Sequence, residues 1–554
     1  MAIMRDGSAG SAGSFGSFGT AGAGRTRSRL GVRRRGGALL AAALAAGLLL
    51  TGCGADGTSS DSGSAKKGPA HDARKGGPTG GSADESANGP AASVAPDGDQ
   101  DGKRERDGGA DYRSTFALDV DTASYGYARS TLAEGRLPDP GTVRPEEFVN
   151  SFRQGYERPE GNGFSVTVDG ARTGDDGWRL MRVGLATAQA PSNGERPPAA
   201  LTFVIDISGS MGEPGRLDLV KTGLADLTGQ LRADDSIALV TFSDEARTVL
   251  PMTRLGTSGG AARDRVQDAI DTLEPTDSTN LDAGVRTGYA TAVKGVRAGA
   301  TNRVVLMSDA LANTGETAAD AILERVADAR RAHGITLFGV GVGSDYGDAL
   351  MERLADKGDG HTTYVSSRAD AKKVFVQQLP ANVELRARDA KAQVAFDKRA
   401  VSDFRLLGYD NRRVADDDFR DDRVDGGEIG PGHTVTALYA VKLREGAEGR
   451  VAKATVRWLD PESRAPRETS GTVSASALTR PLWSDATAPR LRLSAVAAYF
   501  AHRLGGASDK PYPSEPGLNE LASRAEGLTA TTEDNDVRAL ADAVRDAAEL
   551  RRTE

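Results

Sequence analysis

The spacing of apolar residues divides the chain into parts with different expected structures. Between residues 199 and 380, short runs of Val, Ile, Leu and Phe alternate with segments whose apolar residues recur every three or four positions. The runs predict buried strands, and the recurring positions predict amphipathic helices. Near-continuous apolar strands that alternate with helices are typical of a mostly parallel, doubly wound sheet. We therefore expect an α/β domain at 199–380.

The expected elements of this domain follow one another closely. Strands are predicted at 201–206, 236–242, 303–309, 335–343 and 362–367, with an antiparallel edge strand at 246–252. Helices are predicted at 217–231, 261–273, 281–293, 318–332 and 346–355. Right-handed crossovers place the loops that follow the strands on one rim of the sheet, and such sheets bind ligands at that rim.

The domain is flanked by a region at 111–198, which contains plausible strands, and by a region at 381–554, whose first part alternates apolar and polar residues at period two, as antiparallel strands do. These strands are expected at 164–170, 178–188, 383–396, 404–409, 433–443 and 452–460. The C-terminal region ends in helices, expected at 491–503 and 536–551. We expect the strands around 164–186 to join those after Val383 in one β-rich part, into which the α/β domain is inserted.

The region at 111–198 begins with a short strand, a turn and two helices, with Thr122 as the expected N-cap of the first helix. Asp119 and Asp121 lie in the turn. Carboxylates so close together suit a metal site, but turn and cap roles before a helix are the favoured interpretation.

The first 52 residues have the pattern of an export signal. Arginines precede an apolar run at 38–50, which is too short to span a bilayer and fits a signal-peptide core. The run ends in "LTGC", which resembles the lipobox of bacterial lipoproteins. The resemblance implies that Cys53, the only cysteine of the chain, is acylated and anchors the protein to the extracytoplasmic face of the cell membrane. The pattern leaves open whether the chain is exported by the general secretory pathway or by the twin-arginine pathway.

Residues 53–110 are rich in Gly, Ser, Asp, Pro, Lys and Arg and poor in large apolar residues, so they cannot bury a core. We interpret them as a disordered tether, whose coil would span about 40 Å. Residues 1–52 carry a net excess of six positive charges, so removing them lowers the formal net charge from −8 to −14. This acidic balance argues against a nucleic-acid partner.

Three loops on the expected rim carry side chains with oxygen atoms. The first holds Asp206, Ser208 and Ser210 directly after a strand, the second presents Thr279 before a helix, and the third ends a strand at Asp309. In this order and context, the residues resemble the metal-ion-dependent adhesion site of von Willebrand factor type A (vWA) domains, which have a Rossmann-like fold. The resemblance implies that these five residues hold a metal ion.

The resemblance has one departure and one extension. At the third loop the family usually has Thr-Asp-Gly, and this chain has Ser308, Asp309 and Ala310, so metal affinity is expected to differ because alanine lacks glycine's conformational freedom. The segments "STFALDVDTASYGYARSTLAEGRLP", "VRPEEFVNSF" and "LLGYDNR" resemble the flanking regions of bacterial YfbK-like proteins, which carry a central vWA domain.

Two carboxylates and three hydroxyls form a hard oxygen site, without the imidazole or thiolate that favours zinc or copper. Mg²⁺ is the expected ion because it readily keeps waters in its coordination shell, with Mn²⁺ or Ca²⁺ as alternatives. The family resemblance implies that an Asp or Glu carboxylate of a partner protein completes the coordination. The simpler interpretation is that the serines only cap the following helix and Asp309 only ends its strand.

The sequence therefore predicts a membrane-anchored binding protein that uses its ion to hold an acidic residue of a protein partner. A scaffold or assembly factor for another envelope complex is the alternative. A metal-assisted hydrolase is less favoured because no general base is predicted beside the site, so an enzyme is not expected.

Overall fold

The structure is a computed structural model. It describes residues 112–174, 176–189, 196–257, 260–276, 278–309, 316–343, 348–379, 384–506 and 512–553. The expected signal peptide at 1–52, Cys53 and the tether lie outside these residues. None of the helices in the described ranges is both long and apolar enough to cross a lipid bilayer.

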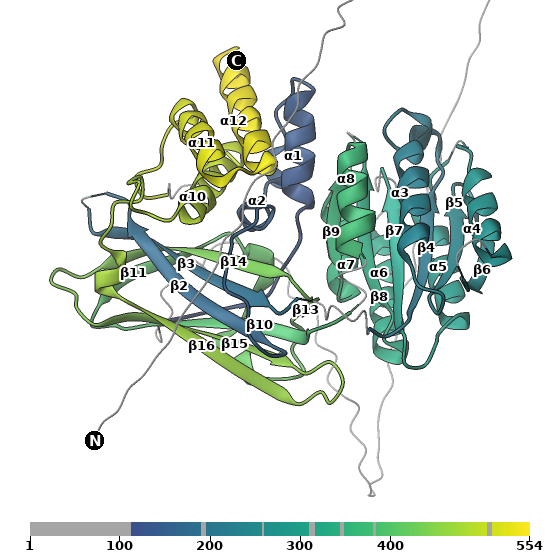
Figure 1. Cartoon of the computed structure of the whole chain (residues 1–554), viewed down its shortest axis with the longest axis horizontal. Helices are drawn as coiled ribbons and strands as arrows, with labels where there is room; N and C mark the ends of the chain where they lie inside the picture. The colour runs from purple at the N-terminus through teal and green to yellow at the C-terminus, as the bar shows by residue number, and fades with distance from the viewer. Residues whose placement is uncertain are drawn as a thin grey trace, which may run out of the picture. The chain divides into compact units, whose positions relative to one another are not determined.

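The central α/β domain is built on a six-stranded sheet with the order β6-β5-β4-β7-β8-β9 (Figure 1). All neighbours in it pair in parallel except β5 and β6, which are antiparallel, so the edge-strand prediction is confirmed. Every residue of β4 and β5 is buried, which explains their near-continuous apolar sequence. The strands are β4 (Ala199–Asp206), β5 (Ser236–Phe242), β6 (Ala246–Arg254), β7 (Thr301–Ser308), β8 (Thr336–Val342) and β9 (His361–Val365).

Helices cover both faces of this sheet. One apolar cluster joins the sheet to α3, α4 and the helical segment after β9, and a second joins it to α5, α6 and α7. The helices are α3 (Leu217–Gln230), α4 (Ala261–Asp271), α5 (Leu281–Lys294), α6 (Glu316–His333), α7 (Asp348–Lys357), α8 (Arg368–Lys372) and the π-helical turn η3 (Lys373–Gln378). The doubly wound prediction is confirmed.

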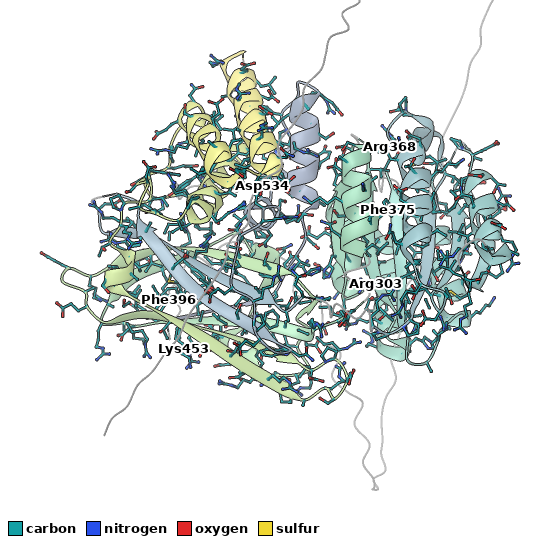
Figure 2. All side chains as sticks on the ribbon, viewed as in Figure 1. Arg303, Arg368, Phe375, Phe396, Lys453 and Asp534 are labelled. Carbon is teal, nitrogen blue, oxygen red and sulfur yellow. The ribbon has the colours of Figure 1, made fainter. Side chains whose placement is uncertain are left out.

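The helical segment formed by α8 and η3 was not expected from the sequence. Phe375, labelled in Figure 2, is fully buried and packs against α3 at Gly223. A Cβ at Gly223 would lie 2.2 Å from the Phe375 ring, so only glycine lets the two segments approach this closely.

The β-rich part consists of two antiparallel sheets whose facing sides enclose one apolar cluster. One sheet has the order β12-β1-β10-β15-β16, with β13 also paired to β10, and the other has the order β11-β14-β3-β2. The strands are β1 (Arg113–Ala117), β2 (Phe164–Arg172), β3 (Trp178–Thr187), β10 (Ala387–Phe396), β11 (Val401–Leu407), β12 (Arg413–Val414), β13 (Gly427–Ile429), β14 (Thr434–Leu443), β15 (Arg450–Leu459) and β16 (Pro466–Ser474).

Strands from before and after the α/β domain pair with each other. β1 pairs with β10, and β3 pairs with β14 over nine residue pairs from Thr434–Ala186 to Lys442–Trp178. The α/β segment is therefore inserted into the β-rich part, as the sequence led us to expect.

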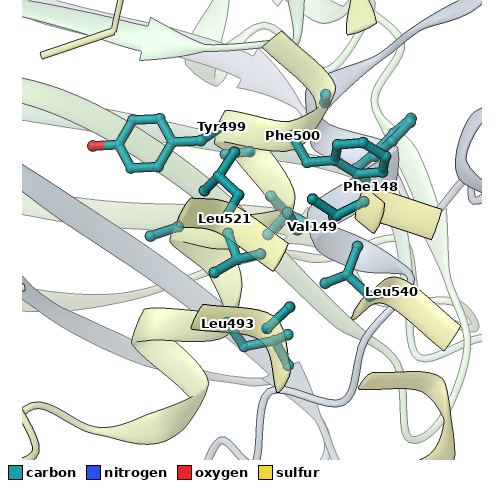
Figure 3. Packing of buried hydrophobic residues seen from close by; sticks show 14 of the residues in the cluster. Phe148, Val149, Leu493, Tyr499, Phe500, Leu521 and Leu540 are labelled. Carbon is teal, nitrogen blue, oxygen red and sulfur yellow. The ribbon is translucent and has the colours of Figure 1, made fainter. Parts of the chain in front are cut away.

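One apolar cluster joins the outer face of the β11-β14-β3-β2 sheet to five helices, which pack on the sheet and on one another. Figure 3 shows the centre of this cluster, where Phe148 and Val149 of α2 meet Phe500 of α10 and Leu540 of α12. The helices are α1 (Ala123–Ala133), α2 (Pro145–Asn150), α10 (Pro489–Leu504), α11 (Leu518–Thr532) and α12 (Asn535–Thr553). The remaining short segments are 3₁₀ turns: η1 (Pro140–Thr142), η2 (Gly209–Gly212), η4 (Asp410–Arg412), η5 (Asp416–Arg420) and η6 (Ala475–Leu478).

The start of α1 differs from the expectation. Thr122 occupies the N-cap position, but its side chain accepts no capping hydrogen bond and its hydroxyl lies 3.5 Å from that of Thr363. Glu147 of α2 takes over the capping role, because its Oε2 accepts from the Ser124 backbone N–H at 2.8 Å. A cap from a distant helix was not visible in the local sequence.

Asp119 and Asp121 bind Arg412, a largely buried arginine that links the β-rich part to the α/β domain. Arg412 Nε lies 3.1 Å from Asp119 Oδ2, and its Nη2 lies 3.2 Å from Asp121 Oδ2. Arg412 also pairs with Asp356 of α7, and Asp121 Oδ1 accepts from the backbone N–H of Thr362 in β9 at 2.7 Å. Asp119 has the expected turn role as well, since its Oδ1 accepts from the Asp121 backbone N–H at 2.7 Å.

Candidate metal centre

The candidate site lies where the strand order of the α/β sheet reverses. The chain leaves β4 towards β5 on one side, while β7 lies on the other side of β4. β4 and β7 run parallel and in register up to the pair Ile205–Met307, so the next residues, Asp206 and Ser308, end neighbouring strands. Open α/β sheets bind ligands outside the carboxyl ends of the strands at such a reversal.

Four of the five expected site residues form one hydrogen-bonded cluster. Asp206 Oδ1 accepts from the Ser208 backbone N–H at 2.8 Å. The hydroxyls of Ser208 and Ser210 lie 3.2 Å apart, and Ser210 donates to Asp309 Oδ1 at 3.0 Å. Both carboxylates are fully buried, so the loops after β4 and β7 hold two acidic groups and two hydroxyls together inside the rim.

Thr279 lies in the loop before α5, which the backbone fastens to the same rim. The Thr276 N–H donates to the Ile207 carbonyl at 2.6 Å, and the Asn280 N–H donates to the Ser243 carbonyl at 2.6 Å. Thr279 itself is half-buried, and among the described residues its hydroxyl has no hydrogen-bond partner. Its role as a ligand therefore stays a prediction.

Burial and charge make this cluster favourable for a cation. Burial raises the pKa of the Asp206 carboxyl to about 6, and the neighbouring charge of Asp309 adds to the rise. Hydrogen bonds from Ser308 and Ser208 oppose it by stabilising the charged form. Two carboxylates held this close repel each other in a poorly solvated site, and a positive charge between them would relieve the repulsion.

The sequence analysis did not predict two further residues of the site, Ser308 and Arg216. Ser308 donates to Asp206 Oδ2 at 2.5 Å and is fully buried. Arg216 forms an ion pair with Asp309 Oδ2 and also donates to Glu213 Oε2 at 2.6 Å. The available signals were a hydroxyl directly before the strand-terminal aspartate and a basic residue six positions after Ser210 in the same loop.

The residues present fit a hard divalent ion through the chemistry of their donors. Asp206 and Asp309 supply negative charge, and the hydroxyls of Ser208 and Ser210 converge with them as neutral oxygen donors. Within the described ranges, no three His, Cys, Asp or Glu side chains are grouped so that they could hold a metal ion. The candidate centre is of another kind, because most of its expected protein ligands are hydroxyls. Ala310, the departure from glycine in the third loop, lies outside the described residues.

Sequence models of known protein families match most of the folded chain. A model described as "von Willebrand factor type A domain" matches residues 200–377, which include the cluster around Asp206. A model described as "Uncharacterized protein YfbK, C-terminal" matches residues 382–545, and one described as "von Willebrand factor" matches residues 103–179.

Known proteins resemble the chain to different extents. Uncharacterized protein YfbK of Escherichia coli (strain K12) is 31% identical over 445 residues, which are 75% of this chain and 75% of that protein. Inter-alpha-trypsin inhibitor heavy chain H3 of Pongo abelii is 23% identical over 303 residues, covering 51% of this chain and 33% of that protein. A solved structure, a von Willebrand factor type A protein from Catenulispora acidiphila, is 14% identical, covers 70% of this chain and 91% of its own, and has a TM-score of 0.42. With its central type A domain and its match to YfbK along three quarters of both chains, the protein belongs to the YfbK-like family of vWA-domain proteins.

Proposed function

We propose that this protein is a membrane-anchored, extracytoplasmic binding protein that holds a protein partner through a divalent ion at the rim of its vWA domain. The observation that carries the proposal is the convergence of Asp206, Ser208, Ser210 and Asp309 at the strand-order reversal. Thr279, on the adjoining loop, is the fifth proposed ligand. Membership of the vWA family supports binding rather than another use of this rim.

The proposed ligands have two roles, which depend on whether they carry a charge. The carboxylates of Asp206 and Asp309 hold the ion, and the hydroxyls of Ser208, Ser210 and Thr279 shape its coordination without adding charge. Bound Mg²⁺, or Mn²⁺ or Ca²⁺ in its place, supplies Lewis acidity towards an oxygen ligand from outside. An Asp or Glu carboxylate of the partner is the proposed ligand, because it combines hard oxygen with negative charge.

Two alternatives make different demands on the site. A scaffold or assembly factor for another envelope complex would bind its partners without needing the ion. A metal-assisted hydrolase would need a general base, and the described side chains that contact the two carboxylates are serine hydroxyls and Arg216, which do not accept protons at neutral pH.

The partner interaction is tested by capture from an envelope extract of the source organism on the immobilised full-length protein. We expect the native protein to capture a specific partner in the presence of Mg²⁺. Chelator, or the substitution Asp206→Asn, should lower the affinity for that partner by about 30-fold or more, as the loss of one side of a buried charged contact does. Asp226→Asn, an equal change of charge at an exposed position on α3, is the matched control and should bind like the native protein.

The identified partner then provides the second half of the same test. Exchanging its contacting Asp or Glu for the corresponding amide should cause the same loss as Asp206→Asn. Full affinity in chelator would refute the ion-mediated contact and favour the scaffold alternative.

The lipid anchor is tested separately through Cys53. The native protein is expected to partition with membranes, and Cys53→Ala should be released from them or retain its leader, because the acylated residue is missing. Membrane fractionation with mass spectrometry of the mature N-terminus measures both. A native protein that is found soluble, with its leader cleaved elsewhere, would contradict the anchor.

A further inference from the structure

Arg216 places a positive charge inside the candidate metal centre. Its side chain is only 3% exposed, and its Nη1 pairs with Asp309 Oδ2, one of the two oxygens of a proposed metal ligand. The other oxygen of Asp309 accepts from Ser210. Without an ion, the charge of Asp309 is therefore already neutralised by a group of the chain itself.

Packing holds this guanidinium in its place. Gly343, at the end of β8, has φ +79°, and a Cβ there would lie 2.6 Å from Arg216 Nε. The Gly343 carbonyl is fixed in turn, because the hydroxyl of Tyr364 in β9 donates to it at 2.6 Å. Tyr364 packs edge-on against Tyr127 of α1, with ring centroids 5.8 Å apart. Arg216 thus has little room to leave Asp309.

A divalent ion brings a second positive charge close to the Arg216 guanidinium. Of the described groups in the cluster, Asp206 and Asp309 contribute two negative charges and Arg216 contributes one positive charge. Glu213 also contacts Arg216, but its side chain is 64% exposed and water screens it. Positive charges placed this close in a buried site repel each other, and a carboxylate from outside would be attracted to both.

We propose that Arg216 couples the two binding events at this site, so that a divalent ion and a carboxylate ligand each bind more tightly when the other is present. This inference rests on the proposed function and adds the residue that enforces it. In the ion-free protein Arg216 pairs with Asp309 and opposes the approach of a second cation. In the ion-bound protein its charge adds to that of the ion and attracts the carboxylate.

The test measures Mn²⁺ binding to the full chain by electron paramagnetic resonance, with acetate as the carboxylate probe and chloride at equal ionic strength as the reference. We expect acetate to tighten Mn²⁺ binding to the native protein by about fivefold or more after correction for acetate–Mn²⁺ association in solution, which is the lower end of ordinary coupling between sites. Arg216→Gln should bind Mn²⁺ about tenfold more tightly in chloride, because a like charge has been removed, and should lose most of the acetate effect.

Two variants separate charge from position. Arg216→Lys retains the charge and should retain the coupling. Arg254→Gln removes one positive charge at an exposed position at the end of β6. Arg254 pairs with Ser236 at the start of β5, so it lies at the edge of the sheet away from the candidate site. This variant should behave like the native protein. If Arg216→Gln does not fold, Gly343→Ala replaces it, because the added Cβ displaces the guanidinium and should also weaken the coupling.

The outcomes distinguish this inference from the proposed function. A native protein that binds Mn²⁺ neither in acetate nor in chloride would overturn both. A native protein that binds Mn²⁺, together with unchanged affinity and unchanged acetate coupling in Arg216→Gln or in Gly343→Ala, would overturn the role of Arg216 and leave the proposed function standing.

Discussion

Exchanging Asp206 for asparagine is expected to abolish the stabilisation of this protein by Mg²⁺. A ligand that binds only the folded state adds about 2.7 kcal/mol to the unfolding free energy at a concentration of 100 times its dissociation constant. For a domain of this size, that corresponds to a rise of about 5–10 °C in the melting temperature. The native protein should show this rise in differential scanning calorimetry, and the variant should not, because one of its two charged ligands is gone.

The asparagine variant separates loss of the ion from loss of the fold. Its side-chain oxygen can still accept from the Ser208 N–H, and its amide can donate to the Ser308 hydroxyl, where Asp206 Oδ2 is now the acceptor. Because burial disfavours the charged form of Asp206, we expect the ion-free variant to melt at the native temperature or above it. Asp226→Asn is the control that keeps the Mg²⁺ response. An equal rise in Asp206→Asn would remove this residue from the proposed ligands.

The α/β domain was predictable because its signals are local. β4 and β5 are buried on both faces, so their sequences are apolar throughout, and the helices around them show the three-and-four spacing of a single buried face. The elements that were missed have weaker patterns. β16 is an edge strand with mostly exposed residues, and α11 buries small side chains alongside leucines, so neither shows a strong period.

The oxygen donors of the candidate site could be predicted from the sequence, but the positively charged side chain of Arg216 could not. The strand-to-loop positions of Asp206, Ser208, Ser210 and Asp309 follow from strand ends that can be read from the sequence. Arg216 contacts Asp309 across 93 positions of the chain, through a loop whose path no local pattern predicts. The same limit applies to the N-terminal cap of α1, where a glutamate from another helix replaces the expected threonine side chain.

Exchanging Arg412 for methionine is expected to destabilise the protein by about 3–5 kcal/mol at pH 8, because it leaves buried carboxylates without their cation. Asp119 and Asp121 are almost fully buried, and Asp356 is largely so. Burial already raises the pKa of Asp121 well above its ordinary value and that of Asp356 to about 6, and Arg412 opposes both rises. Without Arg412, both pKa values should rise further.

The pH dependence of this loss has a definite sign. A carboxyl group whose pKa is higher in the folded than in the unfolded state takes up a proton on folding, so its unfavourable effect grows as pH rises between the two values. The deficit of Arg412→Met should therefore be largest near pH 8 and smaller near pH 5, in urea denaturation at each pH. Adding Asp121→Asn to the variant should recover part of the loss. Arg413→Met, next to it in an exposed pair with Asp410, should cost less than about 1 kcal/mol.

We expect Arg412 to contribute to the coupled unfolding of the two folded parts. It lies in the β-rich part, while Asp356 belongs to α7 and Asp121 binds the backbone of β9 in the α/β domain. The three tryptophans, Trp178, Trp458 and Trp483, lie outside the α/β domain. Their fluorescence therefore reports on the β-rich part and the helices packed on it, whereas far-ultraviolet circular dichroism reports on the α/β domain as well. The two signals should coincide in the native protein and separate in Arg412→Met. Coincident transitions at native stability would mean that other contacts hold the two parts together, and that the buried charges around Arg412 are neutralised without it.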